Sequence, residues 1–169
     1  MNITFKVSRT IPTREQKKLF EWGTDIFGGS KYNLKWRPAD YHVVGYLKEK
    51  PVTHVGIVKH SVRIGSVHKT VGGIGGVVTV PQKQKQGLAK ICLLHTHSYM
   101  RHELAVEYGF LFCIERLVSY YSDIGWRIID DSVLVNQPCG DLFAPLCSMV
   151  FEFSDPWPKG LVTLDSLPW

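Results

Sequence analysis

The chain has 169 residues, of which 44% are hydrophobic and 21% charged, and its formal net charge is +5. This composition is typical of a globular protein, and the length suits one domain over residues 1–169 with a single core. No apolar run approaches the ~18 residues of a membrane span, and the first residues lack a signal-peptide core. We therefore expect a soluble cytoplasmic protein without a membrane partner. The basic residues are scattered, which argues against nucleic acid as a partner.

The first half of the chain predicts one helix and a strand meander. A short strand over residues 2–7 precedes a helix that Gly28 and Gly29 should end. Thr13 and Gln16 fit a capping box at its start. Its apolar residues recur at helical spacing: Leu19, Phe20, Trp22, Ile26 and Phe27. A loop over residues 30–40 leads to strand-like runs at 42–48, 52–64 and 67–80, whose tight turns predict an antiparallel meander.

The second half predicts two helices around a buried strand. Pro81 ends the third run of the meander, and a helix should follow over roughly residues 87–104, with one face formed by Leu88, Ile91, Cys92, Leu94 and His95. We expect a strand at 108–113, a helix at 115–125, and late strands within residues 128–135 and 147–153. The order β-α-βββ-α-β-α-ββ predicts a mixed α/β (α+β) domain. The four cysteines form no CxxC pair, so we expect them to be reduced and structural.

Two neighbouring segments stand out chemically. The run VGGIGGVV (residues 71–78) contains four glycines, which weaken a strand and often mark the close approach of a ligand or another backbone. The cationic loop QKQKQ (residues 82–86) then opens into a helix at Gly87. The first N–H groups of a helix have no internal partner, and the helix dipole favours anions there. The loop is therefore a candidate phosphate cradle, although a solvated helix start explains the same residues equally well.

Two motifs resemble those of the GNAT superfamily of acyltransferases. Residues 84–89 (QKQGLA) fit the pattern Q/R-x-x-G-x-G/A, three residues after the proline that ends a strand. Residues 121–126 (YSDIGW) resemble the family's Y-x-x-x-G-F/W, and an apolar strand lies between the two motifs. The element order extends the resemblance over nearly the whole chain. It implies a single GNAT-like domain whose fourth and fifth strands splay apart.

Two branches of the superfamily are similar to parts of the chain. RPADYHVVGY (residues 37–46) and VFEFSDPWPKGLVTLD (150–165) look like the nodulation-factor N-acyltransferases. GFLFCIERLVSYYSDIGW (109–126) and the final tryptophan look more like the aminoglycoside 2′-N-acetyltransferases. Both branches acylate an amino group on a sugar. The resemblance thus implies an acetyl-CoA-dependent N-acyltransferase that acts on a small-molecule primary amine, with amino sugars as candidates. A longer acyl donor, an acyl carrier protein as donor, and a homodimer all stay open.

The resemblance also assigns donor-binding and catalytic residues. Backbone groups of the loop should hold the pyrophosphate of the donor, at Lys85, Gln86, Gly87, Leu88, Ala89 and Lys90. The open strand edge at Val77, Val78 and Thr79 should pair with the pantetheine arm, and one of its N–H groups could polarise the thioester. Tyr121 is the candidate general acid, because a phenol of pKa ~10 can return a proton to the leaving thiolate. Its neighbour Tyr120 should point elsewhere on the helix.

The sequence contains no obvious general base. Many relatives carry a carboxylate on the fourth strand, where this chain has GGIGG (residues 72–76), and the acceptor-binding Glu of the aminoglycoside enzymes corresponds to Gly75. Candidates for the base are Asp40, Glu115, Asp165, the carboxylate of Trp169 and a chain of waters. Asp165 and the carboxylate of Trp169 could also supply the negative charge that is missing at Gly75. No metal site is expected, because His95 and His97 do not share a helix face. The alternative is a non-catalytic module of this fold that binds CoA or a macromolecule, which the glycines favour and Tyr121 opposes.

Overall fold

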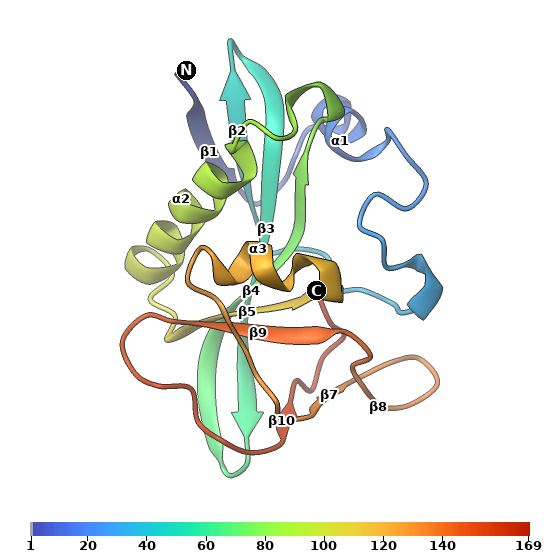
Figure 1. The fold of residues 1–169 in the computed structure, drawn as a ribbon, viewed down its shortest axis with the longest axis vertical. Coiled ribbons are helices and arrows are strands. Elements are labelled where there is room, and N and C mark those ends of the chain that lie inside the picture. The colour runs from blue at the N-terminus through green and yellow to red at the C-terminus, as the bar shows by residue number, and fades with distance from the viewer. Residues whose placement is uncertain (1) are drawn as a thin grey trace.

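The computed structural model describes residues 2–169, which form a ten-stranded mixed sheet with three α-helices (Figure 1). The elements are β1 (Thr4–Ser8), α1 (Thr13–Phe20), β2 (Tyr41–Leu47), β3 (Lys50–Ile64), β4 (Val67–Thr79), α2 (Leu88–His102), β5 (Tyr108–Cys113), α3 (Val118–Ser122), β6 (Arg127–Ile128), β7 (Val133–Val135), β8 (Leu142–Phe143), β9 (Cys147–Glu152) and β10 (Val162–Thr163). The strand order is β6-β9-β5-β4-β3-β10-β7-β8, and β2 pairs with β1 and β3 beside this path. The predicted mixed α/β domain is confirmed.

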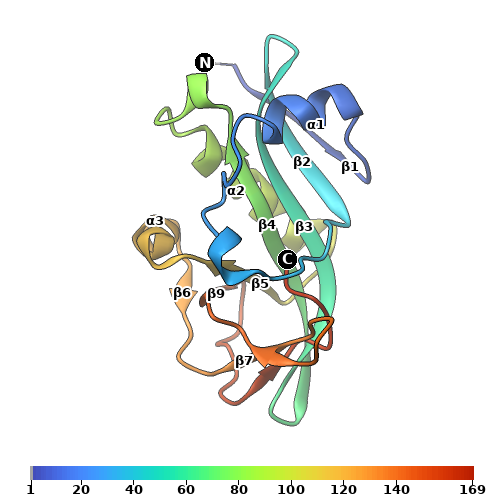
Figure 2. The same cartoon turned by 90° about the vertical axis from the view of Figure 1, so that its right-hand side faces the viewer.

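The predicted meander is present as the antiparallel strands β2, β3 and β4, and the buried strand at residues 108–113 has the expected bounds. Successive side chains of a strand point to opposite faces of the sheet. Val43 accordingly packs in a cluster with Cys92 and Leu93 of α2, whereas its neighbour Val44 packs with Leu19 of α1. The helices α1 and α2 therefore cover opposite faces of the meander (Figure 2).

The strands β4 and β5 are paired over only part of their length. Parallel pairing joins Val71–Ile74 to Tyr108–Leu111, whereas β4 continues to Thr79. Beyond Ile74 the register between β3 and β4 skips, so Gly76 and Val77 lie opposite the single residue Val55. This is a β-bulge, and Gly76 adopts a φ of 57° within it. The predicted splay of the fourth and fifth strands is thus present, with a bulge where it begins.

The first helix is shorter than predicted and its start differs. It ends at Phe20 instead of reaching Gly28, and Pro12 precedes it without any side-chain cap, so the predicted capping box is wrong. The indole N–H of Trp22 donates to the carbonyl of Leu19 over 2.7 Å and satisfies a group at the end of the helix. Trp22 and Phe27, expected on the buried stripe, are consequently exposed.

The buried face of α2 also differs from the prediction. Ile91, Leu94 and His95 are exposed, and the buried residues are Leu88, Cys92, Leu93, Thr96, His97 and Met100. The two polar residues in this set have partners: Thr96 donates to the carbonyl of Cys92, and His97 accepts from the indole of Trp126. A polar side chain that is hydrogen-bonded can be buried, which an apolar pattern does not register. The third helix is likewise shorter than predicted, because a 3-10 turn at Glu115–Leu117 precedes α3.

Candidate functional site

The loop before α2 exposes free backbone N–H groups. Gly87 caps the helix with a φ of 75°, in the left-handed region that favours glycine. The first hydrogen bond of the helix runs from the N–H of Ile91 to the carbonyl of Gly87, over 3.1 Å. The N–H groups of Leu88, Ala89 and Lys90 precede that bond and have no helical partner. Together with the exposed side chains of Lys85, Gln86 and Lys90, they give this surface the polarity that an anion needs.

The strand edge that leads into this loop is open on one side. Val78 and Thr79 pair with His54 and Thr53 of β3, whereas the pairing of β4 with β5 has already stopped at Ile74. Val77 is half-buried, and Val78 is buried. Backbone groups on the β5 side of this segment are available to an extended ligand. The structure therefore brings the predicted edge and the predicted cradle together at one end of β4.

Tyr121 lies in the core between α3 and β5. Its side chain is buried, and its ring centroid is 6.2 Å from that of Trp126. Burial raises the pKa of Tyr121 above its usual value, and Cys113 at the end of β5 acts in the same direction. The phenol is therefore protonated at neutral pH and can donate a proton.

Tyr120 differs from Tyr121 in its surroundings. Its hydroxyl is buried and has no partner, and burial together with Cys92 of α2 raises its pKa. No local sequence pattern marks this buried hydroxyl. All four cysteines are free, and burial raises the pKa of Cys92 and Cys113 to about 12, so both remain thiols at neutral pH.

The glycines of β4 make room for two large side chains. On one face, a side chain at Gly72 would meet Met100 of α2. On the other face, a side chain at Gly73 would overlap the indole of Trp169, and one at Gly75 would come within 2.8 Å of the main-chain carbonyl carbon of Trp169. Trp169 is 5% exposed, and its indole N–H donates to the carbonyl of Phe110 over 3.2 Å. The predicted close approach to this strand is thus confirmed, and the approaching residue is Trp169.

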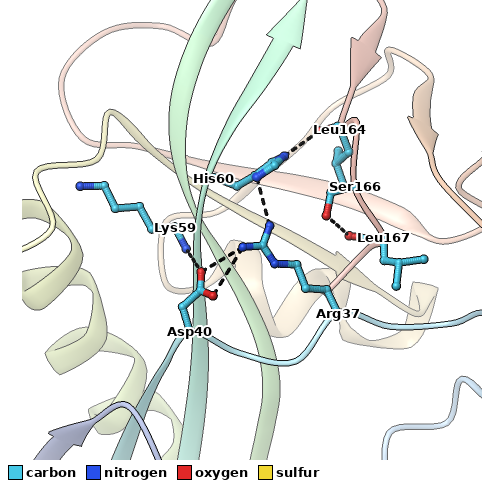
Figure 3. A network of polar contacts seen from close by, with 7 residues as sticks. All are labelled: Arg37, Asp40, Lys59, His60, Leu164, Ser166 and Leu167. Atoms are coloured by element: carbon cyan, nitrogen blue, oxygen red, sulfur yellow. Dashed lines mark hydrogen bonds and ion pairs between the residues drawn. The ribbon is translucent and has the colours of Figure 1, made fainter.

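A polar network holds the segment that carries Trp169 (Figure 3). The N–H of Arg37 donates to the carbonyl of Pro168 over 2.7 Å. His60 Nε2 lies 2.7 Å from the carbonyl oxygen of Leu164, and a carbonyl only accepts, so Nε2 carries the proton. Nδ1 of His60 then accepts from the Arg37 guanidinium over 3.1 Å. The network therefore links the loop before β2, the strand β3 and the C-terminal segment.

Two carboxylates predicted to bind the acceptor lie around this network. Asp40 forms an ion pair with Arg37 at 3.3 Å and accepts the N–H of Lys59 over 3.0 Å (Figure 3). Asp165 is exposed, with a φ of 53°. Asp40 is thus connected through Arg37 and His60 to the segment of Trp169, whereas Asp165 faces solvent.

A pair of histidines that sequence analysis missed adjoins the bulge of β4. His54 Nδ1 lies 2.6 Å from the carbonyl oxygen of Gly76, and His54 Nε2 lies 3.0 Å from His42 Nδ1. Burial lowers the pKa of His54 to about 4, and burial also lowers the pKa of His42. The only signal in the sequence was a histidine in each of two neighbouring strands of the meander.

Residues 2–169 contain neither a cluster of metal ligands nor a membrane-spanning helix. Within residues 2–169, no three His, Cys, Asp or Glu side chains converge in the manner of metal ligands. Across the same residues, no helix combines the length and apolar character that crossing a bilayer requires.

Comparison with known proteins links this geometry to one family. The model of an acetyltransferase (GNAT) domain matches residues 27–129, which is more than half of the chain. No curated protein matches the chain by sequence. Among solved structures, a GNAT family acetyltransferase from Brucella melitensis in complex with acetyl-CoA is 14% identical with a TM-score of 0.57, and the match covers 94% of each chain.

Two structures from Escherichia coli match this chain with a similar sequence identity and TM-score. The GNAT family N-acetyltransferase YhbS, in complex with CoA, is 14% identical with a TM-score of 0.63, over 96% of this chain and 89% of YhbS. ElaA is 13% identical with a TM-score of 0.59, over 89% of this chain and 100% of ElaA. At these identities the likeness establishes the fold.

Proposed function

Because the chain belongs to the acetyltransferase (GNAT) family, we propose that it transfers an acyl group from an acyl-CoA thioester to a primary amine of a small molecule. The observation that carries the proposal is the continuity of the open edge of β4 with the free N–H groups at the start of α2. An elongated donor with amides at one end and phosphates at the other needs these two features in this order.

Acetyl-CoA is the proposed donor. The Brucella melitensis structure holds acetyl-CoA and the YhbS structure holds CoA, in proteins that share this fold. In this chain the pantetheine arm would pair with Val77, Val78 and Thr79, and the pyrophosphate would bind the backbone of residues 85–90. The side chains of Lys85 and Lys90 add positive charge beside the phosphates.

Tyr121 is the proposed general acid. The amine nitrogen attacks the carbonyl carbon of the thioester, so a C–N bond forms and the C–S bond breaks. The thiolate takes the phenolic proton of Tyr121, which solvent then restores, and the ammonium releases one proton overall. The protonated phenol of Tyr121 and its proximity to Cys113 at the end of β5 support this role. Its raised pKa makes the phenol a weaker acid, so proton transfer should accompany C–S cleavage rather than precede it.

The acceptor side of the proposed site lies on the face of β4 that Trp169 covers. Trp169 lies against Gly75, beside the bulge. The carboxylates of Asp165 and Asp40 would supply the negative potential that attracts the ammonium group of an acceptor. The resemblance of residues 37–46 and 150–165 to sugar-modifying branches supports an amino sugar as the acceptor.

One screen tests the proposal. Titration calorimetry with acetyl-CoA should show binding, and release of free CoA thiol should follow when the protein is given acetyl-CoA and a panel of primary amines that includes glucosamine, an aminoglycoside and a polyamine. Absence of acetyl-CoA binding would refute the donor site. Binding without thiol release from any amine would favour the second candidate, a non-catalytic CoA-binding module, for which the lack of an acidic residue at positions 72–76 is the specific support.

A further inference from the structure

The bulge in β4 depends on a side chain for one of its hydrogen bonds. Gly76 and Val77 fall outside the register that pairs β4 with β3. A bulge leaves such groups without ladder partners. The carbonyl of Gly76 instead meets Nδ1 of His54 at 2.6 Å, and His54 is 2% exposed. Because a carbonyl only accepts, Nδ1 of His54 carries the proton and donates it to the bulge.

The tautomer of His54 fixes that of His42. With the proton on Nδ1, the Nε2 atom of His54 can only accept, and it lies 3.0 Å from Nδ1 of His42. His42 must therefore donate from Nδ1, and the two imidazoles form a directed chain from His42 through His54 to the carbonyl of Gly76. The ring of Phe20 packs edge-on against the imidazole of His54, with 4.9 Å between the ring centroids, and helps to hold the orientation of His54.

The same hydrogen bond determines where an N–H group points. The carbonyl of Gly76 and the N–H of Val77 belong to one planar peptide unit, which is trans, so the two groups point in opposite directions. A glycine at a φ of 57° gives this peptide little steric resistance to rotation. Whatever holds the carbonyl of Gly76 therefore also aims the N–H of Val77, on the strand edge that β5 leaves open.

We propose that His54 is a positioning residue for acyl transfer: by holding the carbonyl of Gly76, it aims the N–H of Val77 at the carbonyl oxygen of the thioester. The inference rests on the proposed transfer from acyl-CoA. An N–H that is fixed in advance stabilises the oxyanion that develops during attack, whereas a mobile one must first be ordered. The effect of His54 should thus fall on the chemical step more than on donor binding.

The test compares three substitutions in the full chain, with acetyl-CoA and the best acceptor from the amine panel. His54→Phe keeps a ring beside Phe20 but removes the donor to Gly76, and kcat should fall by about 10²-fold, the typical effect of losing one oxyanion donor. The dissociation constant of acetyl-CoA should change less than about threefold. His54→Gln offers an amide N–H to the same carbonyl and should restore part of kcat.

His97→Phe is the matched control, because His97 is also buried, and burial lowers its pKa to about 4. It lies on α2 and bonds Trp126 rather than the bulge, so its replacement should lower stability and leave kcat near wild type. Equal losses of kcat in His54→Phe and His97→Phe would overturn the inference. A wild-type kcat in His54→Phe would also overturn the inference. In either case, acyl transfer by the wild-type protein would still support the proposed function.

A second measurement does not depend on turnover or on the folding of any variant. Nitrogen-15 NMR of the wild-type imidazoles should show His54 protonated at Nδ1 and unprotonated at Nε2 at neutral pH. A proton on Nε2 of His54 would exclude the bond to Gly76 and overturn the inference.

Discussion

The indole of Trp169 lies directly against the backbone of Gly73, on the face of β4 opposite α2. The ring also reaches β5, where its N–H donates to the carbonyl of Phe110, and its centroid is 5.9 Å from that of His60 on β3. Trp169 thus joins three neighbouring strands at the level where β4 and β5 begin to diverge. Position 169 belongs to the framework of the proposed site.

Gly73→Val should displace Trp169 and weaken acceptor binding. The new side chain would overlap the indole, and overpacking of this kind typically costs about 1–3 kcal/mol of the free energy of unfolding. The KM for the acceptor should rise while the affinity for acetyl-CoA stays unchanged, as steady-state kinetics and calorimetry would measure. Gly29→Ala is the control, because nothing lies within 4 Å of a Cβ there. An unchanged acceptor KM in folded Gly73→Val would remove Trp169 from the acceptor site.

Gly87→Glu should abolish acetyl-CoA binding through its charge. The negative side chain would stand beside the N–H groups proposed to hold the pyrophosphate. Because Gly87 has a φ of 75°, any side chain also strains the backbone, so Gly87→Gln is the matched control with equal strain and no charge. Calorimetry should show a much larger loss of affinity for Glu than for Gln. Equal affinities in the two variants would contradict the phosphate cradle.

Tyr121→Phe should lower kcat by about 10²–10⁴-fold with little change in acetyl-CoA affinity, because it removes only the proposed acid. Tyr120→Phe is the neighbouring control. It removes a buried hydroxyl that has no partner, so it should leave kcat unchanged and keep or raise the free energy of unfolding. A loss below roughly threefold in Tyr121→Phe at saturating acceptor would assign Tyr121 a structural role.

The free energy of unfolding should depend on pH through two buried histidines. Burial lowers the pKa of His54 and of His97 to about 4, below the ~6.5 of an unfolded chain. Between these values the unfolded chain binds protons that the folded chain does not. Stability should therefore be complete above pH 6.5 and fall as the pH drops toward 4, by about 1.4 kcal/mol per histidine for each pH unit.

Urea unfolding between pH 4.5 and pH 7.5 would measure this dependence, and His97→Phe should reduce its slope by about 1.4 kcal/mol per pH unit, the contribution of one histidine. A free energy of unfolding that does not change across this range would contradict the neutral state of the two histidines.

The parts of the fold that the sequence predicted have strong local signals. The meander follows from runs of β-branched residues between short turns, and the strand at residues 108–113 is apolar throughout. The start of α2 follows from Pro81 and Gly87, whose backbone preferences act on their immediate neighbours. Each of these features depends on residues that are close together in the chain.

The parts that the sequence missed join residues that are far apart in the chain or depend on hydrogen bonds. Trp169 covers Gly73 only after the intervening chain has folded, and no local pattern marks that contact. The buried face of α2 was predicted wrongly because a polar residue, His97, is buried with Trp126 as its partner, whereas Ile91 is exposed. His54 and Gly76 meet because a bulge shifts the register, and a bulge has no reliable sequence signature here.

The contact between Trp169 and Gly73 also constrains how this chain could diverge. A mutation that placed a glutamate at position 73 would meet the indole before it could serve as a base, so it would be selected against while the tail keeps its path. Loss of the indole at position 169 would remove that barrier. Homologues should therefore fall into two groups, one with glycine at position 73 and an aromatic residue at position 169, the other with a larger residue at position 73 and no aromatic residue at position 169. Intermediates between the two groups should be rare.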